Sequence, residues 1–91
     1  MAKVYLQKTL KITIPEDLDY SNIFEDLFSE YTKEHELVRV KTTNLGSMFK
    51  LTYDIVLKDP NKEKELIDKI RCRNGNLEIT ISKQESISGE L

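Results

Sequence analysis

Cysteine is scarce in this chain, and long apolar runs and a basic excess are both absent. Cys72 is the single cysteine, so no internal disulfide can form and no second thiolate is available for a zinc site. No stretch approaches the roughly 20 apolar residues that cross a bilayer. The N-terminus lacks the apolar centre of a signal peptide. These absences predict a small cytoplasmic domain that holds no metal and no cofactor.

The charge balance argues against a nucleic-acid partner. Lys and Arg number 14 and Asp and Glu number 16, which gives a net charge of -2. Proteins that bind nucleic acid usually carry a basic excess that neutralises phosphates. The length of 91 residues predicts one core, which we assign to a single domain over residues 1–82. Residues 83–91 have no periodicity and are expected to form a flexible tail.

Alternating apolar residues predict a β-hairpin in the middle of the chain. From Phe49 to Leu57 the apolar residues fall on every second position, which is typical of a strand with one buried and one wet face. Val38 and Val40 alternate with basic residues in the same way, so the same count puts both valines on the buried face. The segment 44–47 is the expected turn.

Helical spacing on either side of the hairpin predicts two helices. The first carries a stripe about 140° wide, with Asp17 or Asp19 as its N-cap, and ends before the polar segment 33–36. The second starts at Asp59-Pro60 and ends at Asn74-Gly75. The two stripes consist of Tyr20, Ile23, Phe24, Leu27, Phe28 and Tyr31, and of Leu66, Ile67 and Ile70.

Two further strands complete the pattern, one at each end of the chain. The first alternates at Leu10, Ile12 and Ile14, and the last at Leu77, Ile79 and Ile81. The order β-α-β-β-α-β predicts an α+β fold of the ferredoxin-like (ACT-like) kind. We expect a four-stranded antiparallel sheet with both helices on one face and with the first and third strands in the centre.

The opposite face of this sheet is predicted to be polar and uncovered. By parity it carries Lys11, Thr13, Arg39, Lys41, Lys50, Thr52, Asp54, Val56, Glu78 and Thr80. An RNA-recognition module needs aromatic rings on that face to stack bases. Here Phe49 and Tyr53 share the parity of the core residues, so we expect both rings beneath the helices and no base stacking.

Other chemistries that this scaffold hosts also lack their residues. A copper-chaperone site needs paired cysteines, and an acylphosphatase-like anion site needs a cationic loop where this chain has the acidic 15–19. The glycine of an ACT-type amino-acid loop is missing there as well. His35 is interpreted as a solvated loop histidine rather than a base or metal ligand, and Cys72 as a small filler at a helix end rather than a reactive thiol.

Two polar segments are the candidates for ligand recognition. Arg71, Arg73 and Asn74 lie together at the end of the second helix, and Lys41 and Lys50 lie in the hairpin. Two guanidinium groups beside a turn could bind an anion. A basic helix end followed by a cap would also carry these residues, because cations near a helix C-terminus complement its dipole. Both interpretations stay open for this cluster.

Two runs resemble a known family. The run ELVRVKTTNLGSMFKLTYDIVLKD, 36–59, and the run KEKELIDKIRCRNGNLEI, 62–79, are similar to the C-terminal soluble domain of a family of uncharacterised bacterial multi-pass membrane proteins. The resemblance implies a cytoplasmic domain that meets a membrane only through spans outside this sequence. It brings no catalytic residues with it.

The sequence therefore favours a non-enzymatic regulatory or interaction module. We expect it to dock a protein partner, or to form a homo-oligomer, through the open sheet face or an edge strand, because no acid, base, nucleophile or metal cluster converges. The alternative is an ACT-like sensor of a small anion or nucleotide.

Overall fold

The structure is a computed structural model that describes residues 6–84 of the chain. Its elements follow the predicted order. They are β1 (Gln7–Pro15), α1 (Glu25–Tyr31), β2 (Thr32–Thr43), the 3-10 turn η2 (Asn44–Gly46), β3 (Met48–Leu57), the 3-10 turn η3 (Pro60–Lys62), α2 (Glu63–Arg73) and β4 (Ile79–Lys83).

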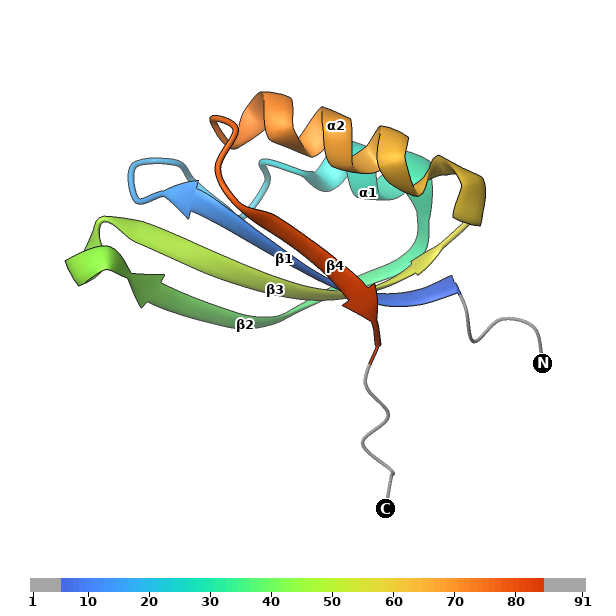
Figure 1. Ribbon diagram of the computed structural model, residues 1–91, viewed down its shortest axis with the longest axis horizontal. Coiled ribbons are helices and arrows are strands. Elements are labelled where there is room, and N and C mark those ends of the chain that lie inside the picture. Colours follow the sequence, from blue (N-terminus) through green and yellow to red (C-terminus); the bar gives the residue numbers. More distant parts are fainter. Residues whose placement is uncertain (1–5, 85–91) are drawn as a thin grey trace, which may run out of the picture.

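The four strands form one antiparallel sheet in the order β2-β3-β1-β4. The first and third strands are central, as predicted from the two crossovers. Both helices lie on the same side of this sheet, and the other side is left open (Figure 1). The predicted α+β fold class is therefore confirmed.

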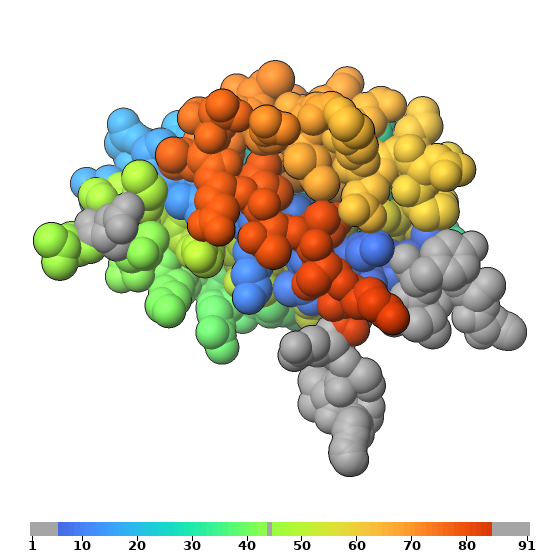
Figure 2. Space-filling model, viewed as in Figure 1, coloured from blue at the N-terminus to red at the C-terminus, as the bar shows by residue number. Residues whose placement is uncertain are grey.

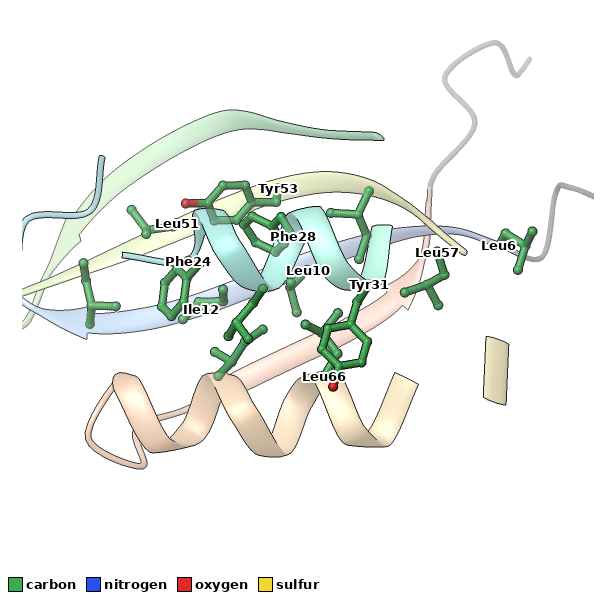
Figure 3. Packing of buried hydrophobic residues seen from close by; sticks show 14 residues of the cluster. Leu6, Leu10, Ile12, Phe24, Phe28, Tyr31, Leu51, Tyr53, Leu57 and Leu66 are labelled. Carbon is green, nitrogen blue, oxygen red and sulfur yellow. The ribbon is translucent and has the colours of Figure 1, made fainter. Parts of the chain in front are cut away.

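The core lies between the helices and one face of the sheet (Figure 3). The predicted strand residues supply its floor, and both helical stripes supply its roof. Its fully buried aliphatic side chains are Leu10, Ile12, Ile14, Leu51, Ile55, Leu57, Leu66 and Ile70. Tyr53 is 5% exposed within this cluster, and Phe49 packs against it with its ring 5.6 Å from that of Tyr20. Both rings lie on the covered side of the sheet, as predicted, with Tyr53 against Phe28 of α1 and Phe49 against Tyr20 in the turn before α1.

Helix α1 is shorter than predicted. It starts at Glu25, and its N-cap residue Phe24 makes no side-chain capping bond. The predicted cap Asp19 instead accepts hydrogen bonds from the backbone N–H and the hydroxyl of Ser21. Those hydrogen bonds lower the pKa of Asp19. They also stabilise a turn, and this turn competes with helix formation. Asp17 lies in the same turn region and caps no helix.

Strand β2 is longer than predicted and follows α1 with no intervening loop. The prediction of a turn at 33–36 is wrong, because His35 lies in β2 opposite Ile55 on the helix side of the sheet. Its ring stacks on that of Phe28 at 5.0 Å. The half-buried imidazole thus packs under α1, and pairing with β3 holds this polar segment in the sheet.

Two register shifts interrupt the pairing of β2 with β3. The second lies between Leu37, which pairs with Tyr53, and Arg39, which pairs with Thr52. One extra residue at this bulge, Val38, reverses the side-chain alternation of the strand. Val38 therefore lines the open face, and the prediction that it shares the buried face with Val40 is wrong.

The last strand is short and runs slightly past the predicted domain boundary. Leu77 lies before β4, and Lys83 is its final residue. The N–H of Gln84 donates to the carbonyl of Gln7, 3.1 Å away. Residues 83 and 84 thus belong to the sheet region, and the rest of the predicted tail, 85–91, lies outside the described residues.

Candidate functional site

A shallow groove of about 650 Å³ runs over the open face of the sheet. Residues from all four strands, and the residue after the last, line it. They are Thr9, Lys11, Val38, Arg39, Lys41, Lys50, Thr52, Asp54, Ser82 and Gln84. The lining holds four basic side chains, one acidic side chain and no aromatic ring, although the chain as a whole is acidic with a net charge of -2.

Strand register brings the four basic side chains of the groove together. Lys41 lies directly opposite Lys50 in the β2–β3 ladder. One row further on, Arg39 lies opposite Thr52, which in turn lies opposite Lys11 of β1. Residues in adjacent rows on one face are diagonal neighbours within reach of long side chains. These four cations thus form one cluster, which we call the basic cluster.

The basic cluster has little neutralising charge within the described chain. Lys50 lies 3.8 Å from a carboxylate oxygen of Glu78 across the sheet. No acidic side chain of residues 6–84 lies within 4.0 Å of the charged groups of Lys11, Arg39 or Lys41. Like charges placed directly opposite in a ladder are destabilising. Lys41 and Lys50 form such a pair, and of the two only Lys50 has a carboxylate nearby in the part of the chain that the structure describes.

The next row of the open face has the opposite charge. Glu36 lies directly opposite Asp54, and Asp54 accepts a hydrogen bond of 3.3 Å from the hydroxyl of Thr9. The open face thus carries two like-charge pairs of opposite sign, Lys41 with Lys50 and Glu36 with Asp54. The β2 members of the two pairs stand on either side of the bulge.

The second predicted candidate, at the end of α2, lies on the helix side of the sheet. Arg73 makes two hydrogen bonds to the carboxylate of Asp26, at 2.6 and 2.9 Å, and a third to the carbonyl of Ile23. The bond from Arg73 lowers the pKa of Asp26 to about 2. Arg71 donates to the side chain of Asn76 at 3.3 Å. Both guanidinium groups are therefore engaged in hydrogen bonds within the chain.

Asn74 is fully buried and joins α2 to the sheet. Its side-chain amide donates to the carbonyls of Thr13, at 2.8 Å, and Leu77, at 3.3 Å. Its Oδ1 atom is buried and has no hydrogen-bond partner among the described residues. Of the five predicted ligand residues, only Lys41 and Lys50 therefore line the groove.

A smaller hollow of about 220 Å³ lies beside α1 on the helix side. Tyr20, Glu25, His35, Leu37 and Tyr53 contribute to its lining. The imidazole Nε2 of His35 lies 3.5 Å from a carboxylate oxygen of Glu25. Burial raises the pKa of Tyr53 to about 12, with a further contribution from the nearby carboxylate of Glu25. The rings of Phe24, Phe28 and Tyr53 in its lining are buried in the core, whereas those of Tyr20 and His35 are half-buried.

Residues 6–84 contain no group of three or more His, Cys, Asp or Glu side chains that could hold a metal ion. The one cysteine is not the small filler that was predicted, since Cys72 is exposed on α2. It is exposed because the buried stripe of α2 passes through Leu66 and Ile70, two positions before Cys72.

Lys11 and Arg39 are the basic groove residues that were missing from the predicted ligand set. The alternation of apolar and polar residues along each strand had predicted that both lie on the open face. Their closeness to Lys41 and Lys50, however, depends on which residues face each other across β1, β3 and β2. The hydrophobic alternation defines faces, but register adds the position along the strand. A register fixed from the hairpin turn would have paired Lys41 with Lys50.

No family model matches the chain, and no curated protein matches it. The crystal structure of protein MK0293 from Methanopyrus kandleri AV19 is similar to it in fold, with a TM-score of 0.59 and 10% sequence identity. The match covers 90% of this chain and 49% of that one, so the chain spans about half the length of the similar protein. At this identity the likeness concerns the fold alone. No helix within residues 6–84 is long and apolar enough to span a membrane.

Proposed function

We propose that this domain is a non-enzymatic interaction module that docks an acidic segment of a protein partner in the groove of its open sheet face. The observation that carries the proposal is the basic cluster, which gathers Lys11, Arg39, Lys41 and Lys50 on one face of an acidic chain. An uncovered groove lined by residues from all four strands suits an extended segment better than a small substrate, which usually occupies a deeper and more enclosed site.

Charge placement supports this choice of partner. Three of the four cations have no acidic neighbour within 4.0 Å among residues 6–84, so a carboxylate ligand would not have to displace an internal partner. Glu36 and Asp54 at the other end of the face would repel an acidic segment there. That repulsion would fix where the segment lies along the strands and favour one register over others.

The family resemblance supports a location for such a module. Runs 36–59 and 62–79 resemble the soluble domain of bacterial multi-pass membrane proteins. We propose that the domain works in the cytoplasm, at the face of the membrane that holds its parent protein, and regulates that protein by docking, as the ferredoxin-like (ACT-like) prediction also suggests. Reading the complete gene for membrane spans tests the location.

A small-anion sensor is the second candidate, and one contact favours it. Lys41 and Lys50 face each other directly, and a phosphate held between them would relieve their repulsion. Inorganic phosphate or ATP should then raise the melting temperature of the domain at low salt, with no requirement for an extended ligand. A flat response to both compounds argues against the sensor and leaves the docking proposal standing.

The docking proposal is tested by fluorescence anisotropy with a labelled peptide of about ten glutamates, titrated at low salt. Replacing Lys11→Gln and Lys50→Gln together should weaken binding about tenfold, because two charge contacts are lost. Binding should also fall steeply as salt rises, since exposed charges are screened. The fold should hold, because Lys50→Gln removes the like charge opposite Lys41.

A matched control removes the same charge from the helix side. The double variant Lys62→Gln and Lys64→Gln changes two exposed lysines near the start of α2 and should bind the peptide as the unchanged chain does. Equal losses in the two double variants would mean that only net charge matters. That result, or no binding by the unchanged chain, would refute the groove as the docking site.

A further inference from the structure

We propose that strand β2 is also a homodimer interface, which pairs antiparallel with β2 of a second copy about a two-fold axis through its bulge. This interface shares the β2 residues Arg39 and Lys41 with the docking groove, whereas Lys11 and Lys50 of the groove lie outside it, so variants of those two lysines test the groove alone. Strand β2 is an edge strand of the sheet, so its outer side pairs with no other strand of residues 6–84. An edge of twelve residues is a template for a further strand, although charged side chains and bulges usually block such pairing. Strand β2 carries both, and the proposed register is the one in which the bulge and the charges of two copies match.

Exposed apolar side chains gather on this edge. The large hydrophobic residues that are exposed within 6–84 are Leu37, Val38, Val40 and Leu45, all on β2 or in the turn after it. In Figure 2 this part of the chain, in green, lies at the lower left, away from helix α2 in yellow and orange. The opposite edge, β4, has only five residues, and its isoleucines are half-buried against the core. Exposed apolar residues that gather at one edge of a sheet, and not at the other, mark that edge as a surface for contact with another protein.

The bulge makes β2 symmetric about its own centre. By their partners on β3, Leu37 and Val40 lie on the helix side, and Glu36 and Lys41 lie on the open side. Val38 and Arg39, between them, both line the open face. Starting from the point between Val38 and Arg39, successive side chains therefore lie on the same sequence of sheet faces in both directions over residues 34–43. An antiparallel copy centred there matches every side chain with one on the same face, which a continuous sheet requires.

The same register also matches the chemistry of the side chains. It places Glu36 opposite Lys41 of the second copy, twice in the dimer, and Leu37 opposite Val40, also twice. A two-fold axis placed on Val38 itself would instead put Leu37, from the helix side, against Arg39, from the open side. The charges that normally keep edge strands apart here attract a second copy in one register.

The two like-charge pairs of the free chain gain from this arrangement. Glu36 faces Asp54, and Lys41 faces Lys50, within one copy. In the dimer each of the β2 residues has an opposite charge on its other side. The two sheets become one, with both open faces on the same side, because the two-fold axis is perpendicular to the sheet. The two grooves then form one longer basic surface.

Charge reversal tests the register without threatening the fold. Glu36→Lys and Lys41→Glu each turn an internal like-charge pair into an opposite one, so each monomer should stay folded. Each should weaken dimerisation by at least about tenfold, because it creates two like-charge contacts across the axis. The double variant exchanges the charges and should restore the dimer. Sedimentation velocity over a concentration series measures all four proteins, and Glu34→Lys, which would face Thr43, is the matched control.

Disulfide trapping gives an independent measure of the same register. In a Cys72→Ser background, a mixture of the single variants Leu37→Cys and Val40→Cys should form a crosslinked heterodimer on mild oxidation, since directly opposite residues have the separation that a disulfide spans. Neither variant alone should crosslink with itself. A strict monomer at millimolar concentration, or a double charge variant that stays weakened, would overturn the proposal. The Lys11→Gln and Lys50→Gln protein should dimerise normally, which separates this interface from the groove.

Discussion

Asn74 shows how a residue that resembles a ligand contact can instead hold the fold together. It follows a basic helix end, which is where a recognition turn was predicted, yet it is fully buried under the sheet. Its amide satisfies two backbone carbonyls from separate segments, those of Thr13 and Leu77. Buried polar groups need such partners, so the side chain fixes the position of α2 relative to β1. From sequence alone, a helix C-terminal asparagine gives no sign of this burial.

Replacing Asn74→Ala should lower the free energy of unfolding by about 1–3 kcal/mol, because it leaves two carbonyls without their donor. The unpaired Oδ1 atom of Asn74 would be removed at the same time, which keeps the loss below that of a fully bonded amide. Urea denaturation followed by circular dichroism measures the change. Asn22→Ala, at an exposed turn position, should shift the unfolding free energy by less than about 0.5 kcal/mol. Equal effects of the two substitutions would contradict the role given to Asn74.

At the scale of elements, α1 and α2 are joined by polar contacts at both of their ends. Arg73 of α2 holds Asp26 of α1. At the other end, the hydroxyl of Tyr31 donates to Glu65 at 2.5 Å, which raises the pKa of Tyr31 to about 12 and lowers that of Glu65. These contacts align the two helices over one core. Helix α1 depends on such contacts, because it has only seven residues and would not be stable alone.

The Asp26–Arg73 contact should make stability depend on pH in a defined window. The pKa of Asp26 falls from 3.8 to about 2 on folding, so its stabilising effect is present above the higher value and is lost as pH falls through the lower one. At neutral pH, Asp26→Asn should therefore melt at a lower temperature than the unchanged chain. The difference should shrink between pH 4 and pH 2. A difference that stays constant over that range would show that the carboxylate charge is not involved.

The elements that sequence predicts best are those with one strict period. Strands β1 and β3 and helix α2 follow such patterns. The inward position of Phe49 and Tyr53 was predicted from the period of β3. The start of α1 was misplaced because Tyr20 and Ile23 are half-buried from a turn, and burial in a turn can imitate helical spacing. The bulge at Val38 leaves no local signal, because it depends on how β3 pairs with β2.

At the scale of the whole molecule, charges of one sign form local clusters, although the net charge is small. The open face carries the basic cluster, while Glu25, Asp26 and Glu30 of α1 lie exposed on the helix side. Composition alone reported only the balance of -2 and therefore argued against a nucleic-acid partner, while a small anion or nucleotide stayed open as a ligand. The candidate site could be predicted as far as its face, and two of its four cations were named. The rest required the register that places the strands side by side.

The most direct measurement is a titration of the isotopically labelled domain with the acidic peptide, followed by two-dimensional amide NMR spectra. The docking proposal predicts that salt-sensitive shifts are confined to the open face and centre on Lys11, Arg39, Lys41 and Lys50. Amides of α1 and α2 should stay in place. Shifts centred on the end of α2 near Arg71 and Arg73, or no shifts at low salt, would contradict the assignment of function to the open face.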